Sequence, residues 1–236
     1  MKRTTLVLSI LLFVSLAAGA QEPAPSLPPA KAGTAAVQFV FDWSVQNPPR
    51  YEISVDSTGR ATYHCEPAAD EKGGSAPDAY SVEWTASEAT RTKIFDAAEK
   101  LDYFKDGNYD TKAKVAKTGV KTLTYKDGSR DSSTRYNYSE NPLVRDLTHI
   151  FQSIATTAEM GRKLRHDFRF DKLGVEADLK ALQEEQKQGN ALEFGSIAPI
   201  LQKIIDDPNM MRMSQQRAKD MLRVAALPNP QTSAAK

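Results

Sequence analysis

The sequence predicts an α+β fold: an antiparallel sheet of about six strands with two packed helices, followed by a C-terminal all-helical extension. Three observations support this prediction. Apolar and polar residues alternate in several runs between Val37 and Tyr138, tight-turn sequences separate some of these runs, and after Gly161 three helical patterns follow. Strands grouped in one part of a chain and helices in another favour an antiparallel sheet with helices packed beside it.

Two-residue alternation predicts four strands in the first part of the chain. The apolar members of the first strand are Val37, Phe39, Phe41 and Trp43. A hairpin follows over residues 51–65, and its turn contains Gly59, which accepts the left-handed backbone of a tight turn. The apolar side chains of the fourth strand are Tyr80, Val82 and Trp84.

A helix is predicted directly after the fourth strand. The segment Thr85-Ala-Ser-Glu88 fits a capping box, in which the Thr85 hydroxyl accepts an early backbone N–H and Glu88 reaches back to the cap. Ile94, Ala98 and Leu101 are spaced four and three residues apart and give this helix its buried stripe.

A second hairpin and a second helix complete the predicted sheet domain. The hairpin turns at Lys126-Asp-Gly-Ser129, and Asp-Gly is a strong hairpin signal. Its strand residues are Leu123 and Tyr125 before the turn and Thr134, Tyr136 and Tyr138 after it. Asn141 caps the following helix, and Pro142 lies in its first turn. The apolar face of that helix holds Leu143, Leu147, Ile150, Phe151 and Ile154.

Three further helices are predicted in the extension. The first ends at Gly189 and the second at Asp207-Pro208. Their apolar positions are Val175, Leu179 and Leu182 in the first, Ile197, Ile200, Leu201 and Ile204 in the second, and Ala218, Met221, Leu222 and Ala225 in the third.

The predicted organisation has five segments and indicates an exported protein. Residues 1–20 are typical of a signal peptide, so we expect cleavage after Ala20 and a location in the periplasm or outside the cell. The apolar run in this segment is shorter than the roughly 20 residues that cross a bilayer, so we expect a soluble mature protein without a membrane span. The remaining segments are a Pro-rich disordered linker (21–36), the α+β sheet domain (37–157), the helical extension (158–226) and a disordered tail (227–236).

The mature chain is expected to be nearly neutral. Without Lys2 and Arg3, 29 basic residues stand against 30 acidic ones, which does not favour nucleic acid as a partner. Cys65 is the only cysteine, so no internal disulfide can form and stability must come from apolar packing.

The segment Asp106-Gly-Asn108-Tyr-Asp110 places oxygen ligands at positions one, three and five of a calcium loop. The match ends there, because Thr111 stands where the loop needs glycine and Lys117 where it needs a bidentate glutamate. We expect a helix-to-strand connection, and the sequence assigns no role to the Lys-rich loop 105–117.

Cys65 is a candidate nucleophile, with His149 or His166 as its base. Its strand position is in phase with Tyr63 on the inward face, while His64 points to the other face. We expect a buried, inert thiol, and a reactive or intermolecular thiol stays open. The spacing of the three histidines does not indicate a metal site.

Residues 162–172 carry five basic residues and two aspartates, interleaved with Phe168 and Phe170. An anionic surface is one partner that suits such a segment. We favour a solvated connecting helix whose two aromatics dock on the sheet domain.

Part of the chain resembles a family of uncharacterised exported bacterial domains. The resemblance rests on the hairpin pattern Tyr51-x-Ile53-x-Val55-x-x-x-Gly59-x-x-x-Tyr63, on the helix after Thr85, and on the hairpin strand and turn at 123–128. The resemblance covers residues 50–157 and implies the same plan of hairpins and helices. No activity and no catalytic or binding residues are assigned to that family, so the resemblance implies none here.

On function, we predict a non-catalytic binding or interaction module for a protein, a peptide or a polymer of the cell envelope, with no catalytic residue, cofactor or metal ligand assigned. The chain lacks a Gly-x-Ser-x-Gly turn and a phosphate-cradling glycine loop. Two alternatives stay open: a carboxylate-dependent hydrolase, and a secreted enzyme inhibitor that uses the loop from Glu66 to Ala79. A deep pocket with converging titratable groups would mark the enzyme, and one lined by two carboxylates together with His149 or His166 would overturn this ranking.

Overall fold

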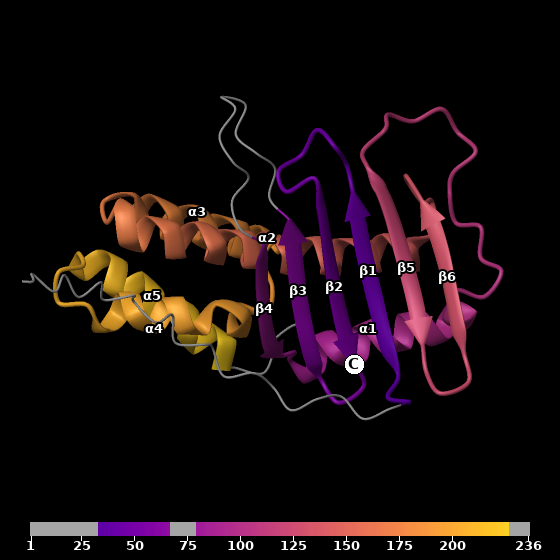
Figure 1. Cartoon of the computed structure of the whole chain (residues 1–236), viewed down its shortest axis with the longest axis horizontal. Helices are drawn as coiled ribbons and strands as arrows, with labels where there is room; N and C mark the ends of the chain where they lie inside the picture. Colours follow the sequence, from indigo (N-terminus) through magenta and orange to yellow (C-terminus); the bar gives the residue numbers. More distant parts are fainter. Residues whose placement is uncertain (1–32, 67–78, 227–236) are drawn as a thin grey trace, which may run out of the picture.

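The computed structural model describes residues 33–66 and 79–226. The strands are β1 (Ala36–Asp42), β2 (Arg50–Asp56), β3 (Arg60–Glu66), β4 (Tyr80–Thr85), β5 (Val120–Lys126) and β6 (Asp131–Tyr136). The helices are α1 (Glu88–Lys100), α2 (Pro142–Phe170), α3 (Gly174–Gln188), α4 (Ala198–Asp206) and α5 (Arg212–Ala226), with short 3₁₀ helices η1 (Asp102–Phe104) and η2 (Phe194–Ile197). The strands form one antiparallel sheet in the order β4-β3-β2-β1-β5-β6 (Figure 1). The predicted α+β fold is confirmed.

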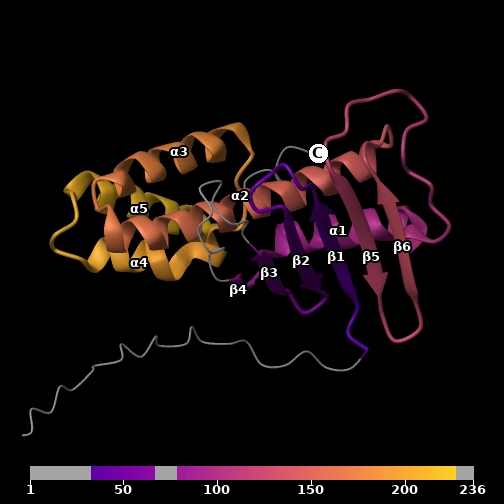
Figure 2. The same cartoon turned by 45° about the horizontal axis from the view of Figure 1, so that its top comes forward.

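Helices α1 and α2 cover one face of the sheet, and α3, α4 and α5 gather beyond β4 (Figures 1 and 2). The predicted alternation holds in the central strands, where Ile53 of β2 and Leu123 of β5 flank Phe39 of β1 in register. All three side chains are fully buried and belong to one apolar core with the inner faces of α1 and α2. Burial of this face is the main source of stability for the sheet.

The start of α1 differs from the predicted capping box. The N-cap is Ser87, whose hydroxyl accepts a hydrogen bond from the backbone N–H of Thr90, so the prediction of Thr85 as the cap is wrong. Glu193 supplies the carboxylate that a local glutamate supplies in a capping box, because it accepts hydrogen bonds from the backbone N–H of Ser87 at 3.0 Å and from its hydroxyl at 2.7 Å. The Trp84 indole N–H donates to the same carboxylate at 3.1 Å. The extension therefore caps a helix of the sheet domain.

Helix α2 begins as predicted, with the Asn141 side chain accepting from the backbone N–H of Leu143 at 2.9 Å. It is 29 residues long and runs past residue 157, where we expected the sheet domain to end. Its first half contributes Leu147 and Phe151 to the sheet core, and its last turns bring Leu164 into a second core.

The two aromatics of the basic segment at the end of α2 do not dock on the sheet, so that expectation is wrong, although Arg165 of the same segment lies over the Tyr80 ring of β4 at 5.3 Å. Phe168 packs on the second core, and Phe170 is 74% exposed. The physical reason is that the helix is straight and long enough to have left the sheet before these residues are reached (Figure 1).

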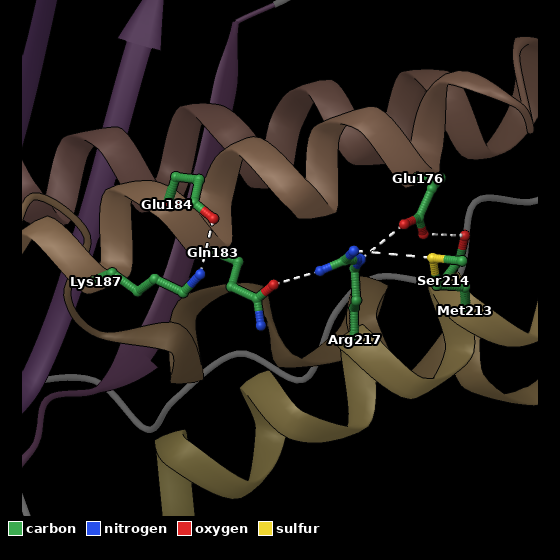
Figure 3. Close-up of polar contacts among 7 residues, drawn as sticks. All are labelled: Glu176, Gln183, Glu184, Lys187, Met213, Ser214 and Arg217. Atoms are coloured by element: carbon green, nitrogen blue, oxygen red, sulfur yellow. Dashed lines mark hydrogen bonds and ion pairs between the residues drawn. The ribbon is translucent and has the colours of Figure 1, made fainter.

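The second core lies between the end of α2 and the helices α3, α4 and α5. Gly189 ends α3 in the left-handed conformation, with φ at 80°, as its place after the helix predicts. A polar network then joins α3 to α5: the Arg217 Nε donates to Glu176 at 2.7 Å, and its guanidinium also donates to Gln183 (Figure 3). The buried Ser214 hydroxyl donates to the other oxygen of Glu176 at 2.9 Å.

Several expectations lie outside the described residues. They are the signal peptide, most of the linker, the C-terminal tail and most of the loop from Glu66 to Ala79. None of the described helices combines the length and the apolar character that crossing a bilayer requires.

Substitution of Gly161 by alanine tests the contact between α2 and η2. In an exposed helix the change would stabilise by up to about 1 kcal/mol. Here a Cβ would lie 2.2 Å from Ile197 Cγ2 and 3.2 Å from its Cβ, so we expect a loss of about 1–3 kcal/mol in the free energy of unfolding, measured with urea. In an Ile197→Ala background the same change should cost much less; an equal loss in both backgrounds would contradict this contact.

Substitution of Glu193 by alanine tests the cap of α1. The change leaves three donors without their acceptor, so we expect a loss of about 2 kcal/mol in the free energy of unfolding. A double-mutant cycle with Ser87→Ala should give a coupling energy above about 0.5 kcal/mol. Glu184→Ala is the control, because its exposed ion pair with Lys187 should contribute less than about 1 kcal/mol. Additive losses would show that Glu193 does not act through Ser87.

Candidate functional site

A cleft of about 390 Å³ opens where the end of β1, the start of β5 and the end of β6 meet α2. Its volume lies in the range of small-molecule sites. We call it the basic cleft, because no aspartate or glutamate is among the described residues that line it. The lining residues that give it its character are Phe41, Trp43, Lys121, Tyr138, Arg145 and His149.

Lys121 is held rigidly beside the basic cleft. Its ammonium donates to the carbonyl oxygens of Gly119 at 3.1 Å and Asn137 at 2.8 Å, and to the carbonyl and hydroxyl oxygens of Thr118 at 3.1 and 3.0 Å. The residue is 5% exposed, and burial lowers the pKa of its ammonium. Because protein oxygens take up its donors, Lys121 contributes a fixed positive potential rather than a free hydrogen bond.

Arg145 and His149 lie one turn apart on α2 and both line the basic cleft. Both side chains are exposed, and no described residue makes a hydrogen bond or an ion pair with either of them. The guanidinium of arginine presents a planar set of donors that matches a carboxylate or a phosphate. This pair is therefore available to an anionic group in the cleft.

Aromatic rings supply much of the apolar wall. The Phe41 and Trp43 rings stand edge to face, with centroids 6.5 Å apart. The Tyr136 hydroxyl is paired with Thr148 at 2.7 Å, while the Tyr138 side chain is 43% exposed. The cleft thus combines an apolar surface with positive potential.

A second groove of about 390 Å³ lies between α1 and α2. Asp96 from α1 and Asp146 and His149 from α2 line it, which is the combination that we took as favouring an enzyme. Both carboxylates are exposed, and within the described part of the chain neither makes a hydrogen bond or an ion pair. The groove therefore brings two carboxylates to one histidine without the burial that usually tunes a general acid.

Cys65 lies in the sheet core, 1% exposed, as its inward strand position predicts. The carboxylate of Glu159 on α2 accepts from the Cys65 thiol at 3.2 Å and from the Tyr63 hydroxyl at 2.5 Å, and it pairs with Arg162 at 2.8 Å. Burial, reinforced by the charge of Glu159, raises the pKa of the Cys65 thiol to about 12. The thiol is therefore protonated at neutral pH and is a poor nucleophile.

The three histidines lie in different surroundings. His64 is on the outer face of the sheet, where its Nδ1 pairs with the Ser81 hydroxyl at 2.8 Å. His166 packs against Phe170 with ring centroids 4.9 Å apart. His149 lines both the basic cleft and the groove between α1 and α2. No group of three His, Cys, Asp or Glu side chains within residues 33–66 and 79–226 is placed to hold a metal ion.

Sequence reasoning missed Trp43, Lys121, Tyr138 and Arg145 as site residues. The sequence did contain one indication of the site. Lys121 is in phase with the buried Leu123 on β5, and a lysine that points inward from a strand needs hydrogen-bond acceptors for its buried ammonium. The others carried no signal, since the cleft forms only when three strands meet α2.

Comparison with protein-family models gave no match to this chain, and no curated protein matched it either.

The raised pKa of the Cys65 thiol predicts how stability changes with pH. An unfolded thiol titrates near about 8.5, below the folded value of about 12, so ionisation favours the unfolded state. The contribution of Cys65 is complete below about pH 8.5 and is lost as the pH rises toward about 12. We expect the free energy of unfolding to fall by up to about 1.4 kcal/mol per pH unit from this group above about pH 8.5.

Urea unfolding of the wild type and of Cys65→Ala between about pH 7 and 9 measures this effect, because that range lies below the pKa of about 10 of unfolded tyrosines. The variant should be less stable at pH 7, and the difference should shrink as the pH rises. A difference that stays constant would contradict the protonated, buried thiol.

Proposed function

We propose that the protein is an exported, non-catalytic binding module that takes an anionic ligand in the basic cleft. The sequence of residues 1–20 supports export with cleavage after Ala20, and the hairpin pattern from Tyr51 to Tyr63 supports membership of the exported domain family that residues 50–157 resemble. The nearly neutral mature chain does not favour nucleic acid as the partner.

The charge of the basic cleft carries this proposal. Lys121 and Arg145 place two cations at a partly apolar cleft that no described carboxylate lines. The nearest carboxylate that acts on Lys121 is that of Asp110, which lies behind the wall and accepts from the backbone of Asn137 and Tyr138. Positive groups that line a cleft raise the local concentration of anions and stabilise one that binds. An apolar body with a carboxylate or another anionic group fits both features of the cleft.

The state of Cys65 supports a non-catalytic role. Its pKa of about 12 and its burial oppose the thiol mechanism, and no described histidine makes a hydrogen bond with it. The basic cleft itself offers His149 as its only histidine, without a carboxylate among the described lining residues to orient it.

A carboxylate-dependent hydrolase is the second candidate, because Asp96, Asp146 and His149 line the groove between α1 and α2. Such an enzyme would use one carboxyl group as a general acid and the other as a base or nucleophile. The exposure of both carboxylates ranks this candidate below the binding module.

Calorimetric titration with N-acetylphenylalanine tests the binding module, with the neutral N-acetylphenylalaninamide as the matched compound. We expect the acid to bind at least fivefold more tightly than the amide, because only the acid carries an anionic group for the cleft. Arg145→Ala should remove most of this difference.

Asp146→Asn is the matched control, because the next residue on α2 lines the other groove. It should leave the binding of the acid unchanged. Equal affinity for acid and amide, or an effect of Asp146→Asn as large as that of Arg145→Ala, would contradict the proposal. Hydrolysis of nitrophenyl glycosides or esters that is lost in both Asp96→Asn and Asp146→Asn would establish the second candidate instead.

A further inference from the structure

The connection between η1 and β5 carries a high density of lysine. Residues 105–119 contain four lysines and two aspartates. Lys112, Lys114 and Lys117 are exposed, and no described residue makes a hydrogen bond or an ion pair with them. Asp110 and Glu140 line the same surface hollow as Lys112, so Lys114 and Lys117 are the cations of this loop that lie away from those carboxylates. In a nearly neutral chain, three exposed lysines in six residues need an explanation.

Hydrogen bonds at both ends fix this loop to the rim of the basic cleft. At the first end, Asp110 accepts from the backbone N–H groups of Asn137 at 2.9 Å and Tyr138 at 3.2 Å. At the second end, the Asn137 side chain donates to the carbonyl of Ala116 at 3.0 Å and accepts from the backbone N–H of Thr118 at 2.8 Å. The lysines are therefore held beside residues that line the cleft.

A backbone–backbone hydrogen bond closes the attachment, because the N–H of Thr111 donates to the carbonyl of Tyr138 at 2.9 Å. The loop rises beyond the end of the sheet where β5 begins and β6 ends (Figure 1). The carboxylate of Asp110, which resembled a calcium ligand in the sequence, is used for this attachment. The loop thus places three exposed lysines beyond the rim of the cleft.

We infer that the ligand of the basic cleft is a polysaccharide with carboxylates along its chain, one unit of which enters the cleft while the following units cross the Lys112–Lys117 loop. This inference rests on the proposed function. A small monoanion would be satisfied by Arg145 and the potential of Lys121, and it would leave the three loop lysines without a role. A polymer with repeated negative charges would contact both the cleft cations, Arg145 and Lys121, and the three lysines of the loop.

The walls of the cleft favour a sugar unit. The C–H face of a pyranose ring packs on aromatic rings, and Trp43 and the exposed Tyr138 supply such surfaces. The sugar carboxylate matches the guanidinium of Arg145. A nucleic acid would also stack on aromatics, but it carries a denser charge that proteins usually meet with a strongly basic domain, whereas the net charge of this chain is +1.

Oligogalacturonates from one to eight units provide the test. We expect the affinity of the wild type to rise at least tenfold from the monomer to the octamer, and to fall with added salt more steeply for the octamer. The triple variant Lys112→Gln, Lys114→Gln, Lys117→Gln should bind the monomer as the wild type does and should lose the gain with length. The control triple variant Lys180→Gln, Lys203→Gln, Lys219→Gln has the same change of net charge, lies in the extension and should keep that gain.

The outcomes separate this inference from the function on which it rests. Suppose that N-acetylphenylalanine binds through Arg145 but that longer oligogalacturonates bind no more tightly than the monomer. The inference of a polysaccharide ligand would then be wrong, and the proposal of a binding module would stand. If both lysine variants lose the gain equally, the effect is one of net charge and the loop has no specific role. Tighter binding of a single-stranded oligodeoxynucleotide of equal charge would assign the surface to nucleic acid instead. If neither compound depends on Arg145, the proposed function itself fails.

Discussion

The long helix α2 contributes side chains to two apolar cores, and this double role holds the sheet domain and the extension together. The sheet leaves an apolar face that the first half of α2 covers with Leu147 and Phe151. Since the helix continues beyond β4, the apolar side of its second half would face water unless other helices packed on it, and α3, α4 and α5 do so. Gly161 lies at the crossing, where η2 comes too close for a side chain. The sheet domain and the extension therefore share α2, and each needs this helix to complete its apolar core.

The second tie between the two parts is polar. Glu193 sits in the left-handed backbone region, with φ at 61°, a conformation that costs a residue other than glycine some free energy. Its carboxylate accepts from the Trp84 indole and from both donors of Ser87, which offsets that cost and caps α1. A cap that is usually made within one turn of chain is here made by a distant segment, so α1 and the extension stabilise each other.

The same helix also places the candidate site. Arg145 and His149 project from α2 toward the strand ends, where Lys121, Trp43 and Tyr138 complete the basic cleft. Asp146, one position further along the helix, faces the groove beside α1. Two differently charged surfaces thus lie along one helix: the basic cleft has cations and no described carboxylate in its lining, whereas Lys93 and Lys100 stand beside Asp96 and Asp146 in the groove. The two candidate functions therefore share His149 and differ in their charged residues.

Local patterns along the chain were enough to predict most of the strands and helices. Three predicted features depend only on residues that are close together in sequence, so the sequence pattern predicts them. They are the alternation at Phe39 and Leu123, the Asp-Gly turn and the Asn141 cap. The inward, inert position of Cys65 followed from the same period. The length of α2, the partner of Ser87 and the residues that line the basic cleft became known only from the folded chain. These depend on side chains that meet across large separations in sequence, and no local period records which distant carboxylate, aromatic ring or lysine a residue will meet.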